Sequence, residues 1–370
     1  MKKCKLNKLF AALLAASLIL AAMESFPVRA EEASSETTTE ISTEATTEAT
    51  TEATTEAKKK DEVIAITISA AGDCTLGIDS RYNDTFNRYY EANGPKYFLK
   101  KVKPVFANDD LTIVNFEGTL TESTNRQVKT FTFKGPEKHV KILKKGSVEV
   151  VNLANNHTYD FGAQGFSDTQ ATLKKNKIKY CYKSTIAYKT VKGVKVAFIG
   201  FNQLENDGEY QVRAAIKKAK KKKAKIIICS FHWGIERDYY PSVQQKSLGR
   251  FAISEGASLV LGHHPHVLQG IEKYQGRYIV YSLGNFCFGG NTNPADKDTM
   301  IFQQTFYVKK GKLQKKNDAK IIPCSLSGKS YTNDFQPRIL SGSEKKNLIS
   351  RMRNFSSGMN VTIKKSGKLK

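Results

Sequence analysis

The 370-residue chain is poor in cysteine and, after its first 30 residues, lacks long hydrophobic runs. Its six cysteines are widely spaced and form no Cys-x-x-Cys pair, which excludes a disulfide framework and a zinc ribbon. No later stretch approaches about 18 apolar residues, so no further membrane span is predicted. Residues 31–57 lack basic residues, although the whole chain carries a net charge of +24. Residues 58–370 therefore carry +28, which favours polyanionic partners.

The first 30 residues have the pattern of an export signal. A basic stretch ends at Lys8, residues 9–22 are apolar, and residues 28–30 form a small-x-small cleavage pattern. As a helix, the apolar stretch would rise about 21 Å, short of the ~30 Å hydrocarbon core, although an uncleaved anchor remains the alternative. We predict a signal peptide or N-terminal anchor at residues 1–30 and an extracytoplasmic protein, secreted or anchored at the outer face of the cell membrane. This compartment argues against nucleic acid as a partner.

The rest of the chain divides by composition into three parts. Residues 31–60 are rich in Thr and Glu, repeat the unit Thr-Thr-Glu-Ala and contain nothing aromatic, which predicts a disordered linker. Residues 61–310 are predicted as the main domain. Residues 311–370 are predicted as a C-terminal extension that packs on this domain, with Lys-rich turns, a helix near residues 344–354 and a basic tail.

From residue 61 onward, short apolar runs alternate with amphipathic stretches. The runs are rich in Val, Ile and Phe, as buried strands are, and lie at residues 63–71, 111–116, 148–154, 194–201, 226–231, 258–261 and 278–282. Helices are predicted between them at residues 95–103, 136–145, 165–175, 209–223 and 242–255. This alternation predicts an α/β fold with a largely parallel sheet, which ends in an antiparallel strand near residues 299–308.

Polar side chains of the kinds that bind metals follow these predicted strands. Five of the six histidines fall at such positions, and only His139 does not. The carboxyl ends of parallel strands meet at one edge of a sheet, where ligands gather, so these side chains are expected to lie together. They are Asp73, Glu117, Asn155, Asn156, His157, Asp160, His232, His263, His264, His266 and Asn285.

Carboxylates, amides and imidazoles together suit Zn, Mn or Fe. Two such ions about 3.5–4 Å apart can acidify a water and polarise an ester or amide oxygen, and Glu117 is the best candidate for a bridging carboxylate. Each residue alone has an ordinary explanation. Asp73 could cap a turn, Asn155 and Asn156 could close a tight loop, and a lone His232 is more often a hydrogen-bonded core residue.

The motifs that carry these residues, taken in order, resemble those of the CapA family of poly-gamma-glutamate capsule biosynthesis proteins. The resemblance extends from about residue 64 to about residue 306 and implies a four-layer α/β/β/α sandwich of the calcineurin-like metallophosphoesterases with a dinuclear metal site. The motifs are Gly72-Asp73-x-x-Leu76-Gly77, Asn115-Phe116-Glu117-Gly118-x-Leu120-Thr121, Asn155-Asn156-His157-x-x-Asp160-x-Gly162, His232-Trp233-Gly234, Gly262-His263-His264-Pro265-His266-Val267-x-Gln269 and Ser282-Leu283-Gly284-Asn285-Phe286.

The resemblance assigns a role to each matching position. It implies two divalent ions (Mn, Zn or Fe) held by Asp73, Glu117, Asn156, His232, His266 and either His263 or His264. It implies that His157 donates a proton to the leaving group and that Asp160 orients His157. Supporting positions are Asn115, Asn155, Trp233 and Asn285.

Two departures from the phosphoesterase pattern put phosphatase activity in doubt. The usual Asp-x-His start is reduced to Asp73 followed by Cys74 and Thr75, and Glu117 is longer than the usual Asp. The family resemblance implies a part in making, exporting or anchoring an anionic polymer, poly-gamma-glutamate, beside membrane-bound synthase subunits at the cell membrane or wall. The alternatives are a non-catalytic, polyanion-binding accessory of the synthase and, more weakly, a secreted phosphodiesterase or nucleotidase.

Overall fold

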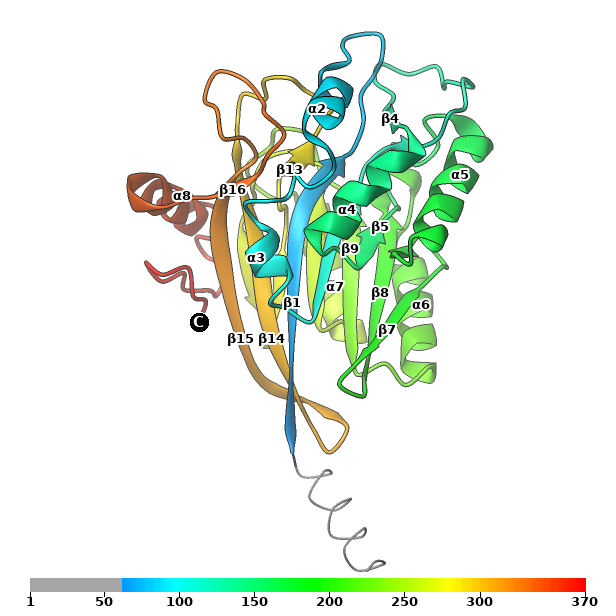
Figure 1. Cartoon of the computed structure of the whole chain (residues 1–370). Helices are drawn as coiled ribbons and strands as arrows, with labels where there is room; N and C mark the ends of the chain where they lie inside the picture. The colour runs from blue at the N-terminus through cyan, green and yellow to red at the C-terminus, as the bar shows by residue number, and fades with distance from the viewer. Residues whose placement is uncertain (1–61) are drawn as a thin grey trace, which may run out of the picture. The chain divides into compact units, whose positions relative to one another are not determined.

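A computed structural model describes residues 62–370 of the chain (Figure 1). The predicted signal or anchor at residues 1–30 and the linker at residues 31–60 lie outside the described residues. Across residues 62–370, each helix is too short or too polar to cross a membrane.

Eight strands form the first sheet. The central strands β1, β2, β5 and β6 run parallel, whereas β14, β15 and β16 continue the sheet antiparallel on the other side of β1. The eighth strand, β13, pairs with the carboxyl end of β1. In sheet order, with β13 last, the strands are β16 (Arg338–Ile339), β15 (Lys312–Ser325), β14 (Asp298–Lys309), β1 (Val63–Thr75), β2 (Leu111–Phe116), β5 (Val150–Asn152), β6 (Lys179–Cys181) and β13 (Asn285–Phe288).

Six strands form the second sheet, and its central strands are parallel. Its two edge strands are antiparallel to their neighbours. In sheet order the strands are β11 (Ile271–Tyr274), β12 (Arg277–Val280), β10 (Leu259–His263), β9 (Ile226–His232), β8 (Val194–Asn202) and β7 (Ala187–Val191). A separate short ribbon pairs β3 (Thr119–Leu120) with β4 (Lys134–Gly135).

The two sheets pack face to face, and helices cover their outer faces. One core cluster joins side chains of both sheets, such as Ile68 of β1 and Ile228 of β9. The first sheet's outer face packs with α2 (Thr85–Asn93), α3 (Lys103–Phe106), α4 (Val140–Gly146) and α5 (Gly162–Lys175). The second sheet's outer face packs with α6 (Glu209–Lys221) and α7 (Val243–Glu255). This arrangement confirms the predicted four-layer α/β/β/α sandwich.

Local sequence accounts for the helices that frame the second sheet. In α6 the buried residues Val212, Ile216 and Ala219 recur at helical spacing, so one stripe faces the sheet. In α7 the Ser242 side chain accepts a hydrogen bond from the backbone of Gln245, whose own side chain accepts one from the Ser242 N–H. This capping box fixes where α7 begins.

Two parts of the predicted secondary structure are wrong. Residues 95–102 form consecutive turns instead of a helix, with hydrogen bonds such as Lys100 N–H to Tyr97 O, and α3 begins only at Lys103. Burial of Phe98, Leu99 and Val102 in this short segment decides its path more than helical periodicity does. The other error concerns β1, which extends through Thr75, so Asp73 lies inside the strand and not after it.

The sequence pattern did not predict α2 or β15, nor the short strands β6, β7, β11 and β13. The long strand β15 pairs with β14 over most of its length. The boundary drawn at residue 310 therefore falls in the turn of a β-hairpin, and the segment after it belongs to the first sheet. The helix predicted near residues 344–354 is α8 (Gly342–Phe355), and its Leu348, Ile349 and Met352 are buried with the core between the sheets.

Gly72 shows how closely the strands approach at the carboxyl end of β1. The next residue, Asp73, donates its N–H to Gly284 O at 2.9 Å. A Cβ at Gly72 would lie 1.8 Å from that same oxygen. We expect Gly72→Ala to lower the free energy of unfolding by about 3 kcal/mol in urea denaturation, because backbone must move. Gly208→Ala is the control, since a Cβ there would meet Gln211 Oε1 at an ordinary contact distance of 3.9 Å, and an equal loss in both variants would contradict the expectation.

Candidate functional site

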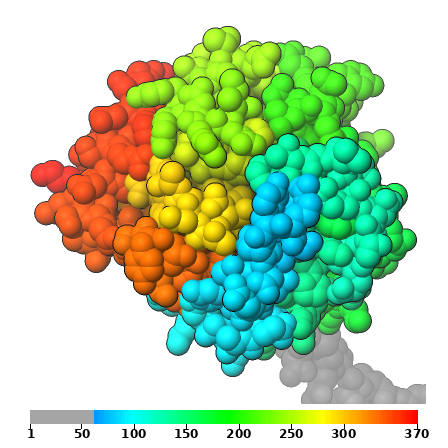
Figure 2. Space-filling view, turned by 90° about the horizontal axis from the view of Figure 1, so that it is seen from above, coloured from blue at the N-terminus to red at the C-terminus, as the bar shows by residue number. Residues whose placement is uncertain are grey.

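The predicted ligand residues meet at the carboxyl ends of the parallel strands of both sheets. Asp73 lies near the end of β1, Glu117 directly follows β2, and His232 and His263 end β9 and β10. The register pairs His263 with His232 on neighbouring strands. Figure 2 looks onto this end of the molecule, where segments from early, middle and late parts of the chain lie side by side.

Asp73 is fully buried and held on several sides. Its Oδ1 accepts a hydrogen bond from Asn115 Nδ2 at 2.9 Å and lies 3.5 Å from His263 Nδ1. Its Oδ2 lies 3.3 Å from His266 Nδ1. Burial alone would raise the pKa of this carboxyl, but its contacts with His263 and His266 hold the pKa well below its usual range. Asp73 is therefore an anion aimed at the histidine cluster.

Glu117 is fully buried, and neither of its carboxylate oxygens has a hydrogen-bond partner. Its Oε1 lies 3.7 Å from His157 Nε2, 4.0 Å from His232 Nε2 and 3.9 Å from His266 Nε2. Burial raises the pKa of Glu117 to about 8. A buried carboxylate without donors is costly unless a cation neutralises it, so this position is suited to a bound cation.

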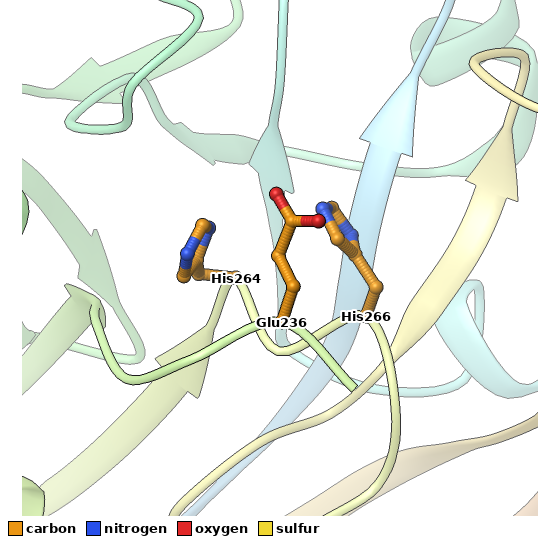
Figure 3. A group of neighbouring side chains, drawn as sticks. All are labelled: Glu236, His264 and His266. Carbon is orange, nitrogen blue, oxygen red and sulfur yellow. The ribbon is translucent and has the colours of Figure 1, made fainter. Parts of the chain in front are cut away.

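His264 and His266 turn toward the same space as Glu236 (Figure 3). One ligand atom from each of these three residues lies within 4.8 Å of the others, and the same holds for Asp73, Glu117 and His266. Both histidines have positive φ angles, 96° and 58°, which places them on one tight loop after β10. His266 thus belongs to both potential ligand groups.

The structure separates the two histidines that the sequence left in competition. His263 Nε2 lies 2.9 Å from Ser230 Oγ, and its Nδ1 faces Asp73. The His264 ring lies 4.7 Å from the His232 ring, and its buried Nδ1 has no hydrogen-bond partner. His264 therefore shares the space of His232, whereas His263 lies beside Asp73.

The residues at this edge fit a divalent metal ion. Several buried ligand atoms have no hydrogen-bond partner, which is unusual for polar groups away from water. They are an oxygen and nitrogen set that borderline and harder divalent ions prefer. The atoms are both Glu117 carboxylate oxygens, Asn156 Oδ1, His232 Nε2, His263 Nδ1 and His264 Nδ1.

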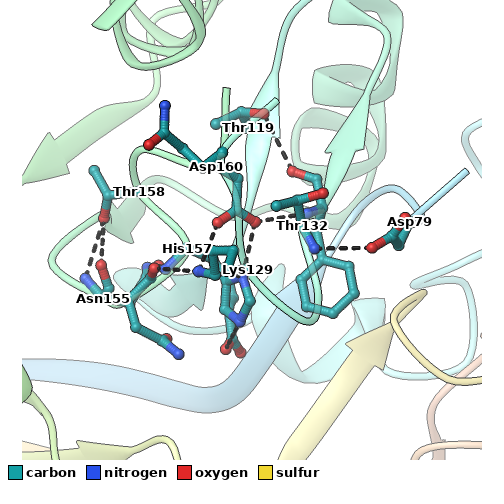
Figure 4. Close-up of polar contacts among 12 residues, drawn as sticks. Asp79, Thr119, Lys129, Thr132, Asn155, His157, Thr158 and Asp160 are labelled. Atoms are coloured by element: carbon teal, nitrogen blue, oxygen red, sulfur yellow. Dashed lines mark hydrogen bonds and ion pairs between the residues drawn. The ribbon is translucent and has the colours of Figure 1, made fainter. Parts of the chain in front are cut away.

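His157 and Asp160 form a pair beside Glu117. His157 Nδ1 lies 2.7 Å from Asp160 Oδ2, which leaves Nε2 directed at Glu117. Asp160 also accepts the Phe133 N–H at 2.6 Å and the Lys129 ammonium at 2.8 Å (Figure 4). Burial lowers the pKa of His157, although Asp160 counteracts that effect. The carboxylate fixes the ring orientation of the imidazole.

Lys129 was not anticipated and joins this pair from a loop. Its Nζ donates to Asp160 Oδ1 and to Asn156 O, both at 2.8 Å, and lies 3.4 Å from His157 Nδ1. Its positive charge lowers the pKa of His157. Lys129→Met should therefore raise that pKa, measured by NMR titration of the imidazole. Lys134→Met is the control, because the Lys134 ammonium of the wild type donates to Ser123 O and not to Asp160. An unchanged or lowered His157 pKa in Lys129→Met would contradict the position assigned to Lys129.

The predicted supporting residues divide into two kinds. Asn115 donates a hydrogen bond from its side chain to Asp73. The Asn155 side chain accepts the His157 N–H at 3.0 Å and donates from Nδ2 to Phe116 O at 2.8 Å. Asn285 Oδ1 lies 2.9 Å from His266 Nδ1. Trp233 differs, because it is buried in the outer core and donates to Tyr281 O at 2.8 Å. Its backbone N–H also donates to His263 O at 3.1 Å, so it supports the site from behind the strand that carries His263.

A cavity of 440 Å³ opens beside these residues. His157, Glu236 and His266 line it together with aromatic residues, among them Phe133 and Phe288. The Phe133 ring lies 4.5 Å from the His157 ring, and the Phe288 ring lies 5.3 Å from the His266 ring. A substrate could therefore reach both histidines from this cavity.

Sequence reasoning missed three residues of this region: Lys129, Asn152 and Glu236. Asn152, which ends β5, donates to Asn115 Oδ1 at 2.9 Å and so holds the amide that contacts Asp73. Its place at a strand end was a usable signal. Glu236 is the second residue after the His-Trp-Gly motif, so inspection of the positions that follow this motif could have found it. Lys129 follows no strand, and its sequence context carries no comparable signal.

Metal removal should make stability fall with pH above neutrality. Burial lowers the pKa of His266, but Glu117 and Asp73 outweigh burial and raise it to about 10, while that of Glu117 rises to about 8. The folded chain thus holds protons that the unfolded chain releases at lower pH, so rising pH costs stability from about 4.5 to 8 through Glu117 and from about 6.5 to 10 through His266. Metal affinity should rise with pH, because the ligands must be deprotonated. Urea unfolding with and without chelator at pH 7, 8 and 9 measures both trends. A free energy of unfolding that rises with pH in the presence of chelator would contradict this account.

The fold is that of the metallophosphoesterase-like proteins: two facing sheets between helices. The chain belongs to the family described as bacterial capsule synthesis protein PGA_cap, whose family model matches residues 67–290. That family is part of the metallophosphoesterase-like superfamily, so the resemblance drawn from the motifs is confirmed.

Curated relatives agree with this assignment. The chain is 33% identical over 251 residues to the capsule biosynthesis protein CapA of Bacillus anthracis, with 60% of each chain covered. It is 32% identical over 246 residues to the PGA biosynthesis protein CapA of Bacillus subtilis, covering 60% of this chain and 63% of that one. A probable polyglutamine synthesis accessory protein of Mycobacterium tuberculosis is 27% identical over 210 residues, covering 48% and 55%. The chain therefore spans about three fifths of the length of the Bacillus relatives it matches.

Proposed function

We propose that this protein takes part in the synthesis, export or anchoring of poly-gamma-glutamate, an anionic capsule polymer, through a dinuclear metal site of the hydrolase type. The observation that carries the proposal is the buried Glu117, whose two oxygens lack donors while three histidine nitrogens face one of them. The names of the Bacillus relatives supply the polymer. The protein works outside the cytoplasm in this proposal, as the N-terminal sequence pattern suggests.

Two ions would be held by two sets of residues that share Glu117. Asp73 and His266 would hold the first, since their side chains lie 3.3 Å apart. Asn156, His232 and His264 would hold the second, with His263 as the orienting neighbour of Asp73. Divalent ions at such a site supply Lewis acidity, which polarises the bond to be broken and acidifies a water.

The chain's own residues would bind substrate and transfer a proton. The aromatic walls of the cavity, Phe133 and Phe288, keep water away from the histidines they contact. His157 Nε2 would give a proton to the leaving group, while Asp160 and Lys129 hold its ring in place.

A second function, a non-catalytic accessory of the polymer synthase, is supported by the excess of lysine. The domain's net charge of +28 would attract a polycarboxylate without any chemistry. The name of the mycobacterial relative, a probable accessory protein, is in line with this alternative. Membrane-bound synthase subunits would be the partners in either case.

Polymer production in cells tests the proposal. A poly-gamma-glutamate producer that lacks its own protein of this family is made to express the full chain. The amounts of released and cell-bound polymer are then measured. Restoration of the polymer supports the proposal, and a Glu117→Gln variant separates the two functions, because only a catalytic site needs that carboxylate. Cells that make no polymer despite normal amounts of folded protein would reject a role in poly-gamma-glutamate formation.

A further inference from the structure

Lysines gather at the end of the molecule opposite the candidate site. Residues 217–225, at the end of α6, contain seven lysines, and residues 309–316, in the turn between β14 and β15, contain five. Lys192 and Lys195 lie in and after the turn between β7 and β8. Figure 1 shows both hairpin turns at the lower end of the sheets. We name these three segments the basal lysine face.

Hydrogen bonds and close approach place the three segments side by side. Lys225 donates its N–H to Lys195 O at 2.8 Å, and Lys195 Nζ donates to Lys222 O at 3.1 Å. A Cβ at Gly311, in the turn between β14 and β15, would lie 3.9 Å from Lys225 Nζ. The positive charges therefore add up on one surface and do not belong to separate faces.

The lysines of residues 217–225 are poorly neutralised by carboxylates of the described part of the protein. Lys192 pairs with Asp110 at 2.9 Å. Within residues 62–370, however, none of the seven lysines of residues 217–225 forms an ion pair with a carboxylate. Lys218 and Lys220 donate to the backbone carbonyl oxygens of Ser184 and Glu255, so the positive charges of this segment stay in excess and favour docking of something negatively charged.

A pocket of 300 Å³ opens within the face. Lys220, Lys225 and Arg277 line it, with Leu313 at one side. Arg277 is partly buried, which lowers its pKa, and within residues 62–370 its guanidinium donates to the carbonyl oxygen of Gln314 at 3.4 Å and pairs with no carboxylate. A partly buried guanidinium without a carboxylate is stabilised by an incoming anion, and its planar fork suits a phosphate group.

The position of the start of β1 indicates which kind of anionic partner the basal lysine face binds. β1 starts at Val63, which pairs with Lys309 of the basal lysine face. From Val63 to Asp73 a strand advances about 33 Å, so the candidate site lies far from this face. Residues 1–61 join the domain here, and they include the apolar stretch 9–22 that is predicted to enter the membrane. A polymer handled at the candidate site has no need of a surface so far away.

We propose that the basal lysine face docks the domain on an anionic lipid surface, with a phospholipid headgroup phosphate in the pocket of Arg277, so that the candidate site points away from the membrane. Each lysine near such a surface strengthens binding, and salt weakens it. The inference does not depend on the chemistry of the candidate site.

Vesicle binding of the full chain tests this orientation. Vesicles of phosphatidylcholine alone are compared with vesicles of about one third phosphatidylglycerol, at about 0.1 M and about 0.5 M salt. The measured quantity is the ratio of the two partition coefficients, because the N-terminal apolar stretch contributes equally to both. The basal variant carries Lys221→Glu, Lys222→Glu, Lys223→Glu and Lys225→Glu. The matched control, of equal charge change on the outer side of the first sheet, carries Lys96→Glu, Lys100→Glu, Lys101→Glu and Lys103→Glu.

In the basal variant, the ratio of the partition coefficients on anionic and neutral vesicles should fall by at least about 100-fold. In the control variant it should fall by less than about threefold. Arg277→Gln alone should lose about fivefold, which isolates the pocket. Equal losses in the two quadruple variants would show that only net charge matters and would overturn the proposal. It is likewise overturned if wild-type protein binds both vesicles equally, or if the basal variant loses binding to poly-gamma-glutamate but not to the vesicles. Thermal unfolding of each variant checks that the fold is intact.

Discussion

The full chain carrying Glu117→Gln is expected to lose its metal ions. Wild-type protein dialysed against trace divalent ions should retain about two per chain, and the variant nearly none, a loss of affinity above about 100-fold. The reason is geometric: Glu117 Oε1 lies within 4.0 Å of three histidine nitrogens, and no protein group donates to either oxygen. An amide in its place keeps the shape but removes the charge that offsets the ions. Mass spectrometry of the purified protein gives the metal content.

Glu149→Gln is the matched control for this experiment. Glu149 directly precedes β5 and is a partly buried carboxyl with a raised pKa, but it accepts the Thr112 N–H at 2.8 Å, near the start of β2, whereas Glu117 follows the end of that strand. Its variant should keep the wild-type metal content. Metal bound equally by wild type and Glu117→Gln would remove Glu117 as the bridge. Absence of metal from wild type itself would end the hydrolase hypothesis and favour the accessory role.

The fold was predictable largely because its central strands are short, apolar and regularly spaced. The strand at residues 111–116 was predicted at its observed bounds, since four of its six residues are large and apolar, as is usual in a buried parallel strand. β15 escaped prediction because half of it is lysine-rich and exposed, and only pairing with β14 makes it a strand. Local pattern cannot report pairing between segments, so edge strands of this kind are decided by tertiary structure.

The residues of the candidate site could be predicted where they lie at or just after the carboxyl ends of strands. Asp73, Glu117 and His232 were found because chain order and strand ends define where they lie. Sequence alone could not separate His263 from His264, because adjacent residues differ only in the direction their side chains take. The reversal of φ at His264 settles those directions, and it depends on the packed loop. Lys129 reaches Asp160 across 31 residues, a contact that no periodicity encodes.

His157→Asn is expected to reduce polymer production by at least about 100-fold while the metal content stays at the wild-type level. His157 Nδ1 is engaged by Asp160 at 2.7 Å, so only Nε2 is available to pass a proton, and it faces Glu117. Asparagine can still accept contacts from the loop but cannot transfer a proton near neutral pH. Polymer is quantified in the complemented cells, and metal content is measured on the purified variant.

Tyr159→Phe is the control for this second experiment, because Tyr159 lies in the same loop, is exposed, and bonds only Tyr182 through its hydroxyl. That variant should make polymer at the wild-type level. If His157→Asn also made normal polymer, proton transfer would not be required and the protein would act as a binding accessory. If His157→Asn lost both polymer and metal, the imidazole would be a ligand and not the proton donor. The pair of readouts thus separates chemistry, metal binding and scaffolding at one residue.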